Sequence, residues 1–315
     1  MTVSIPVVEL KGTRARLPKI GFGSGSKWRI LKAQNAEEEH FAEALAEQVS
    51  NAIGLGFNHI DTAEAYKTYE EVGVGIRRSG TLRSDLWVTD KYGPWSYSWT
   101  NSTGPLWSLE NSLSKMGLEH VDLYLLHSPN ITPETAGITL QEAWDQMEKI
   151  LDSGLAKNIG VSNFDVKSLQ YILQIAKHSP SVNQIEFHPY LQQQSPGIVE
   201  YCKQNGIVVE GYSPLAPLTG GKPGPLDEIL PKIAQKYGKS ELQILLNWSV
   251  QSGVVPITTS SNETRLEEML HIFDFQLDDE EVELITTTGK QKLFRGFMKD
   301  LYGKHDEALV LGDKQ

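Results

Sequence analysis

Four ionisable residues, Asp61, Tyr66, Lys91 and His127, each lie where a short apolar segment runs into a turn. If they meet at one mouth, a carboxylate, a phenol, an ammonium and an imidazole share a site. A tyrosine has an ordinary pKa of about 10, and a neighbouring ammonium lowers that pKa because it favours the phenolate. Asp61 could hold Lys91 charged, and His127 could orient a carbonyl by a hydrogen bond. The set suits proton transfer from Tyr66 to a carbonyl that receives a hydride.

Each of these residues also has an ordinary structural interpretation. An aspartate after a strand often caps a helix or a turn. Tyr66 could be a half-buried packing residue, Lys91 a solvated loop lysine, and His127 a hydrogen-bonding group before Ser-Pro. The coincidence of all four at the ends of apolar segments favours a shared site.

Short runs rich in β-branched and apolar residues alternate with longer segments of helical period. The runs predict strands at Lys19–Gly23, His59–Asp61, Leu86–Asp90, Leu123–His127, Ile159–Ser162, Val182–Glu186, Val208–Tyr212 and Val254–Ile257. Helices are predicted at Glu37–Ile53, Glu70–Arg78, Leu106–Met116, Leu140–Leu151, Val166–Lys177, Ile198–Asn205 and Ser240–Gln251, with a last one from Asn262. Eight strands, each followed by a helix, predict a (β/α)8 TIM barrel, as a single domain over residues 1–315. Barrel sites lie at the carboxyl ends of the strands, which is where the four residues fall.

A doubly wound sheet is the competing fold. Gly21-Phe-Gly-Ser-Gly-Ser26 comes close to its phosphate-binding glycine pattern, but Ser26 stands at the third glycine position. Two regions lie outside the barrel pattern. Val7 to Leu17 predicts a hairpin that caps the barrel bottom, and the segment from Gly289 onward is either a loop over the mouth or a loose tail.

Composition excludes several classes of partner. The chain has 315 residues and a net charge of −11, which argues against nucleic acid or an anionic membrane as the main partner. Cys202 is the single cysteine, so no intrachain disulfide can form. No segment reads as a signal peptide or a membrane span. We therefore expect a soluble cytoplasmic protein, as a monomer or a weak dimer, acting on a small molecule.

Several segments, in order over roughly residues 18–270, resemble the aldo-keto reductase family. They are Gly56-Phe-Asn-His-Ile-Asp-Thr-Ala-Glu-Ala-Tyr66, Val121-Asp-Leu-Tyr-Leu-Leu-His127, Gly154-Leu-Ala-Lys-Asn-Ile-Gly-Val-Ser162-Asn163, Val182-Asn-Gln184 and Gly211-Tyr212-Ser213-Pro-Leu215. The resemblance implies that Tyr66 is the proton donor, supported by Lys91 and Asp61, and that His127 orients the carbonyl. It also implies a nicotinamide cofactor. Its carboxamide would be held by Ser162, Asn163 and Gln184, its ring stacked on Tyr212, and its pyrophosphate contacted by Ser213 and Leu215.

The remaining cofactor contacts are predicted at two loops. Gly23, the last residue of the first predicted strand, and Ser24 and Gly25 after it are assigned to the cofactor. After the last strand the family commonly has Pro-Lys-Ser and then an arginine for the 2′-phosphate of NADPH. Here Thr258, Thr259, Ser260 and Arg265 are the candidates, next to a helix start that suits a phosphate. The alternative is a Ser/Thr-rich cap with Arg265 on a solvated face. We expect NADPH rather than NADH.

The predicted substrate mouth is aromatic. Trp28 follows the first strand and Trp95 follows Lys91, so both join Tyr66 and His127 as candidate substrate-binding residues. Such a pocket suits a bulky or conjugated dicarbonyl, and the chain resembles the fungal branch that includes the ketopantoyl lactone, or conjugated polyketone, reductases. A nucleotide-binding redox sensor or regulatory subunit on the same fold is the alternative. A metal-dependent barrel hydrolase is less consistent, since His59, His127 and His188 lack ligand spacing.

Overall fold

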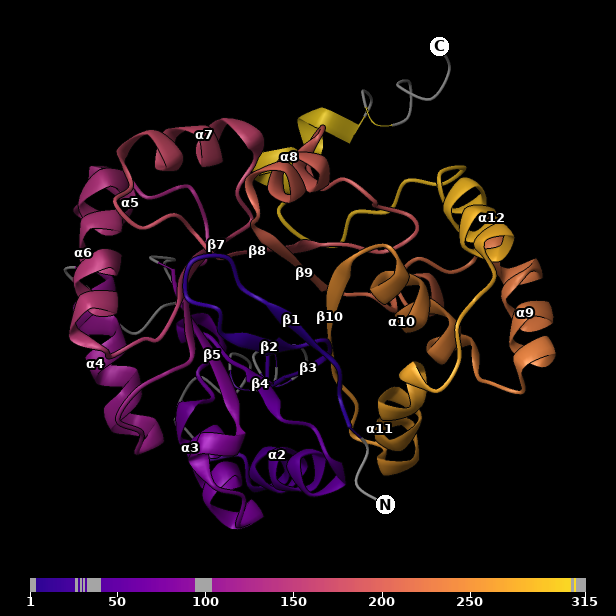
Figure 1. Ribbon diagram of the computed structural model, residues 1–315, viewed down its shortest axis with the longest axis horizontal. Helices are drawn as coiled ribbons and strands as arrows, with labels where there is room; N and C mark the ends of the chain where they lie inside the picture. The colour runs from indigo at the N-terminus through magenta and orange to yellow at the C-terminus, as the bar shows by residue number, and fades with distance from the viewer. Residues whose placement is uncertain are drawn as a thin grey trace.

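The computed structural model describes residues 4–25, 28, 30, 32, 41–93, 104–306 and 309. Within them, eight parallel strands close into a barrel in the order β10-β3-β4-β5-β6-β7-β8-β9, with helices around it (Figure 1). These strands are β3 (Gly21–Gly23), β4 (His59–Asp61), β5 (Trp87–Tyr92), β6 (Leu123–Leu126), β7 (Ile159–Ser162), β8 (Val182–Glu186), β9 (Val208–Tyr212) and β10 (Val254–Thr258). The TIM-barrel prediction is confirmed, and the doubly wound alternative is wrong.

The strand bounds follow the prediction closely, with one difference that matters for the site. β5 continues through Lys91 to Tyr92, which pair with Leu125 and Leu126 of β6. The prediction placed Lys91 just beyond the strand, because two adjacent charged residues, Asp90 and Lys91, are typical of the turn after a strand. It lies inside the strand instead, and its side chain is fully buried. Pairing with β6 therefore fixes the backbone of Lys91 within the barrel wall.

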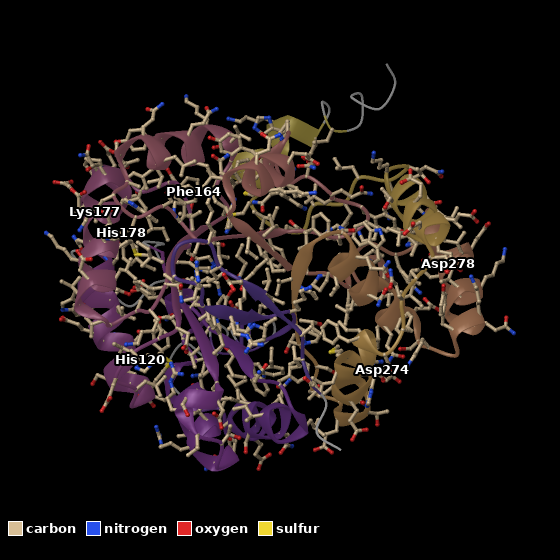
Figure 2. All side chains as sticks on the ribbon, viewed as in Figure 1. His120, Phe164, Lys177, His178, Asp274 and Asp278 are labelled. Atoms are coloured by element: carbon tan, nitrogen blue, oxygen red, sulfur yellow. The ribbon has the colours of Figure 1, made fainter. Side chains whose placement is uncertain are left out.

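The helices lie on the outside of the barrel, and side chains fill its interior (Figures 1 and 2). They are α2 (Glu43–Leu55), α3 (Tyr69–Ser79), α4 (Pro105–Met116), α5 (Pro133–Ala136), α6 (Leu140–Ser153), α7 (Val166–Ile175), α8 (Ile198–Asn205), α9 (Leu230–Tyr237), α10 (Glu241–Gln251), α11 (Glu263–Leu270), α12 (Asp279–Gly289) and α13 (Lys299–Tyr302). The predicted start of the first helix at Glu37 lies outside the described residues. The helices α5, α9, α12 and α13 were not predicted. No helix in the described part of the chain is long and apolar enough to cross a membrane.

The predicted N-terminal hairpin closes the barrel bottom. β1 (Val7–Glu9) and β2 (Arg16–Pro18) pair antiparallel, and Leu10 and Leu17 beside them are fully buried. These leucines belong to one apolar cluster with Trp87, Leu123 and Val182, which start three barrel strands. Burying this end against apolar residues leaves the carboxyl ends of the strands as the open side.

The segment after α12 crosses that open side. The backbone N–H groups of Gly296 and Phe297 donate to the carboxylate of Glu186, at 2.7 and 3.0 Å. The hydroxyl of Tyr302 donates to the backbone oxygen of Asn163. Of the two predicted alternatives, the loop over the mouth is correct for the described residues 290–306.

Candidate active site

The four predicted residues converge at the carboxyl ends of neighbouring strands. Asp61 ends β4, Lys91 is the next-to-last residue of β5, and His127 directly follows β6. Tyr66 ends the short 3-10 helix η1 (Glu64–Tyr66), which follows β4. The barrel thus joins side chains that lie far apart in sequence.

A buried ion pair forms the floor of this site. Lys91 Nζ donates to Asp61 Oδ1 and Oδ2 at 2.6 and 2.7 Å and to the backbone oxygen of Thr62 at 2.9 Å. The same ammonium lies 3.5 Å from Tyr66 Oη and 5.0 Å from the centre of that ring. Burial lowers the pKa of Lys91, but the charge of Asp61 and the phenol of Tyr66 outweigh it, so the pKa is raised. Lys91 is therefore an ammonium at neutral pH, next to the phenol.

Tyr66 and His127 face each other across the mouth. Their ring centres lie 5.8 Å apart with an angle of 82° between the ring planes. This edge-to-face contact holds the two rings in a fixed orientation. A carbonyl oxygen between the phenol and the imidazole could receive a hydrogen bond from each.

Behind Tyr66 lies a cluster of hydroxyl groups that the prediction did not contain. Ser24 Oγ is 3.2 Å from Thr68 Oγ1, which is 3.3 Å from Thr62 Oγ1. The backbone N–H of Ser24 donates to the backbone oxygen of Asp61 at 2.9 Å. Ser24, assigned to the cofactor from the sequence, is fully buried here and joins β3 to β4.

Gly25 packs directly against the ring of Tyr66. A Cβ built at Gly25 would stand 2.9 Å from two carbons of that ring, a distance that real Cβ atoms do not show. Gly25→Ala should therefore displace the phenol and lower kcat by roughly tenfold or more, since small misplacements of catalytic groups are costly. Steady-state turnover tests this. Ser79→Ala, at the C-terminal end of α3, is the folded control. Unchanged kcat in Gly25→Ala would mean that the ring tolerates the displacement.

The predicted nicotinamide residues form a second group next to the first. Ser162 Oγ donates to the backbone oxygen of Gln184 at 2.8 Å, and Asn163 Nδ2 donates to the backbone oxygen of His127 at 2.9 Å. Tyr212 Oη donates to Asn163 Oδ1 at 2.9 Å. Gln184 Nε2 donates to Asp61 Oδ2 at 2.9 Å. These bonds connect the proposed carboxamide contacts directly to the catalytic candidates.

Asn163 is the centre of this second group. Its φ of 61° is left-handed, a conformation that asparagine adopts more easily than most residues. Gln194 Nε2 also donates to Asn163 Oδ1, at 3.1 Å, and Arg295 Nη2 donates to the backbone oxygen of Gln194, at 3.0 Å. The C-terminal segment therefore holds Asn163 directly through Tyr302 and indirectly through Arg295, which binds Gln194. Sequence reasoning missed Gln194, Arg295 and Tyr302, although the aromatic residues of the tail hinted at packing.

The candidate pyrophosphate contacts follow β9. Ser213 has a left-handed φ of 57°, and Leu215 precedes the short helix η3 (Ala216–Leu218). The ring of Tyr212, immediately before them, meets the ring of Phe297 edge to face at 5.6 Å. Phe297 comes from the C-terminal segment and is partly exposed. It adds an aromatic residue to the mouth that the prediction did not name.

The candidate 2′-phosphate loop lies between β10 and α11. The side chain of Asn262 caps α11 by accepting from the N–H of Arg265 at 3.0 Å, and Ser260 Oγ accepts from the N–H of Asn262 at 3.1 Å. The loop is thus a hydroxyl-rich cap, as the structural alternative predicted, and Arg265 is exposed. Thr258 ends β10 with its hydroxyl 3.9 Å from the sulfur of Met269, and Thr259 follows it. Their role toward a phosphate stays a prediction.

Of the two candidate substrate tryptophans, the structure describes Trp28 only. Trp28 donates from Nε1 to Gln48 Oε1 at 2.9 Å, and Gln48 in turn donates to the backbone oxygen of Ser260. Trp95 lies outside the described residues. Gly23, the last residue of β3, pairs with Asp61 of β4. Gln48, absent from the prediction, thereby connects Trp28 with the candidate phosphate loop.

Two of the histidines considered as metal ligands, His59 and His188, instead lie beside a threonine and a glutamate. His59 Nε2 lies 3.0 Å from Thr89 Oγ1 in the barrel interior, and His188 Nε2 lies 3.4 Å from Glu186 Oε1. Burial and the charge of Lys91 lower the pKa of His59 to about 3. Among the described residues, no group of three or more histidine, cysteine or carboxylate side chains could hold a metal ion.

Comparison with known proteins agrees with this geometry. Residues 19–290 match the model of the Aldo/keto reductase family. The chain is 43% identical to the NADPH-dependent alpha-keto amide reductase of Saccharomyces cerevisiae, over 93% of this chain and 94% of that protein. It is 37% identical to the NAD/NADP-dependent indole-3-acetaldehyde reductase of Schizosaccharomyces pombe, over 94% and 99% of the two chains.

Solved structures show the same likeness. A Bombyx mori aldo-keto reductase in complex with NADP superimposes with a TM-score of 0.80 at 31% identity, covering 95% of this chain and 97% of that one. A second silkworm aldo-keto reductase, complexed with NADPH, gives a TM-score of 0.79 at 33% identity, covering 93% and 90%. The family predicted from the sequence is confirmed, and both yeast relatives agree with the fungal branch. This chain is a member of the aldo/keto reductase family.

Proposed function

We propose that this protein reduces a ketone or aldehyde to an alcohol with NADPH, taking the proton from Tyr66. One observation carries the proposal: the Lys91 ammonium, paired with Asp61, lies 3.5 Å from the phenolic oxygen of Tyr66 at the mouth. Ser162, Asn163, Gln184 and Tyr212 lie beside it and offer amide, hydroxyl and aromatic contacts that fit a nicotinamide. The cofactor would supply the hydride.

The residues of the chain would divide the remaining work. His127 would donate a hydrogen bond to the carbonyl oxygen and orient it between the two rings. As negative charge develops on that oxygen, Tyr66 would transfer its proton. Lys91, held charged by Asp61, would stabilise the phenolate that remains. The C-terminal segment would exclude water from this step.

Bulky or conjugated dicarbonyls, such as ketopantoyl lactone, are the proposed substrates. The aromatic side chains of Trp28, Tyr66, Tyr212 and Phe297 come from four parts of the chain around the mouth. They favour a flat or apolar substrate over a sugar, whose hydroxyl groups need polar partners. The name of the budding-yeast relative also refers to an alpha-keto amide, in which two carbonyl carbons are adjacent.

A panel of carbonyl compounds tests the proposal. Ketopantoyl lactone, an aromatic 1,2-dione, an alpha-keto amide, an aliphatic aldehyde and an aldose would each be assayed with NADPH and with NADH. We expect kcat/KM for the dicarbonyls with NADPH to exceed that for the aldose by at least about tenfold, the scale of one apolar contact. NADPH binding without turnover of any compound would instead favour the redox sensor or regulatory subunit.

Arg265→Ala should weaken NADPH binding about tenfold or more and leave NADH binding nearly unchanged, because only NADPH carries the 2′-phosphate. Dissociation constants for both cofactors, from quenching of protein fluorescence, measure this. Glu267→Ala on the same helix is the matched control, since Glu267 is also exposed. Equal losses for NADH and NADPH would show that Arg265 does not contact the phosphate.

The localisation, the oligomeric state and the domain organisation of the protein are also proposals. We propose a cytoplasmic protein that acts as a monomer or weak dimer, with residues 1–315 as one domain. The single cysteine, Cys202, is buried, which is consistent with a reducing compartment. Light scattering of the purified protein tests the oligomeric state, and a single cooperative unfolding transition would support one domain.

A further inference from the structure

A second carboxyl group lies inside the barrel, below the tetrad. Glu210 is on β9, where it pairs in register with Gln184 of β8 and Val255 of β10. It is fully buried. Its Oε2 accepts a hydrogen bond from Gln184 Nε2 at 2.7 Å, while Oε1 has no hydrogen-bond partner among the described residues. The mechanism above gives this carboxyl no role, yet burying it is costly.

Gln184 connects Glu210 to the catalytic floor. The Nε2 of its side chain donates to Asp61 Oδ2 at 2.9 Å and to Glu210 Oε2 at 2.7 Å. An amide has two N–H groups, so both are used by the two carboxyl groups. Only Oε1 is then left to accept a hydrogen bond from a ligand. The paired carboxyl groups therefore set which atom of Gln184 a carboxamide would meet.

The groups that face Glu210 leave it without a cation of its own. β4 presents Asp61 and also His59, whose Nε2 is 3.9 Å from Glu210 Oε1. His59 is neutral, given its lowered pKa of about 3. β5 presents Lys91, which is already bound to Asp61, and β8 and β10 present an amide and an apolar side chain. Burial, and then the charge of Asp61, raise the pKa of Glu210 to about 8.

We propose that Glu210 is a positioning residue, which fixes the amide of Gln184 toward the cofactor and places a titratable carboxyl group beside the Asp61–Lys91 pair. The inference deepens the proposed function and rests on it. At neutral pH the carboxyl is mostly protonated, so Asp61 is the charged partner of Lys91. When Glu210 ionises, a second negative charge joins the floor. That charge disfavours a phenolate at Tyr66 and keeps the phenol protonated to higher pH.

Two variants separate the two parts of this role. Glu210→Gln keeps a hydrogen-bond acceptor for Gln184 but cannot ionise, whereas Glu210→Met keeps the length of the side chain and removes the acceptor. We expect the alkaline limb of the kcat profile for Glu210→Gln to shift to lower pH by roughly 0.5–1 unit, with little change in NADPH affinity. Glu210→Met should bind NADPH about tenfold more weakly. Glu43→Gln, on the exposed side of α2, is the control with the same change in net charge.

Stability gives a readout that is independent of turnover. The folded-state pKa of Glu210 is above its unfolded value, so the folded state binds the extra proton between the two pKa values. Its contribution to stability is present at low pH and is lost as pH rises from about 5 to 8. Glu210→Gln should therefore lose less stability than the wild type over this range.

The outcomes distinguish this inference from the proposed function. If the wild type reduces carbonyls with NADPH, but Glu210→Gln has the wild-type alkaline limb and wild-type loss of stability with pH, the proposed effect of the Glu210 charge is wrong. Wild-type NADPH affinity in a folded Glu210→Met would contradict the positioning of Gln184. If Glu210→Met does not fold, the pH profile of Glu210→Gln alone decides. A folded wild type that binds NADPH without turnover would contradict the proposed function, while the pH dependence of stability would still test the titration of Glu210.

Discussion

Replacing Tyr66 by phenylalanine should lower kcat for carbonyl reduction by about 10²–10⁴-fold, the usual contribution of a positioned general acid. The change removes one oxygen, which lies 3.5 Å from Lys91 Nζ. The ring itself remains, so its contacts with Gly25 and His127 are kept. The affinity for NADPH should stay within about twofold, because only the transition state loses an interaction.

Single-turnover kinetics with NADPH and the best dicarbonyl measure this effect on the chemical step. Tyr171→Phe is the matched control, since Tyr171 lies partly exposed on α7, away from the mouth. It should have the wild-type kcat. Near-normal turnover in Tyr66→Phe would mean that another group supplies the proton, and His127 would then be the first candidate to replace.

The fold was predictable because the barrel strands are buried on both faces. Their apolar runs, such as Leu123–Leu126 of β6, have nearly the bounds that the residue types indicate. β5 shows where this fails. Asp90 points outward to Tyr69 and Ser112, at 3.0 and 2.7 Å, while Lys91 points inward to Asp61. Two adjacent charged residues look like the end of a strand, but each has a buried partner on its own side.

The site was predictable to the extent that its residues lie in recognisable segments. The contacts between segments were not. Gln184 and Asp61 are 123 residues apart, and no local pattern indicates that one amide bridges Asp61 and Glu210. The same holds for Tyr302, whose hydroxyl donates to Asn163 from the far end of the chain. Such contacts depend on closure of the barrel and on the path of the C-terminal segment, which the sequence alone left open.

Replacing Lys91 by methionine should reduce the free energy of unfolding by about 3–5 kcal/mol, because it leaves the carboxylate of Asp61 buried without its cation. Both side chains of this pair are buried. The Lys177–Asp152 pair offers a contrast, since it is exposed at the outer surface, where Figure 2 labels Lys177. Lys177→Met should change the free energy of unfolding by less than about 1 kcal/mol. Urea unfolding at pH 7 compares the two variants.

The double variant Asp61→Asn/Lys91→Met separates stability from catalysis. Removing both charges removes the unpaired carboxylate, so most of the lost stability should return. Turnover should not return, because no ammonium remains beside Tyr66 to stabilise the phenolate that proton transfer leaves. A double variant that regains both would show that the pair serves only the fold. If it regains stability alone, the buried pair is a costly feature of the barrel that is kept for the acidity of one phenol.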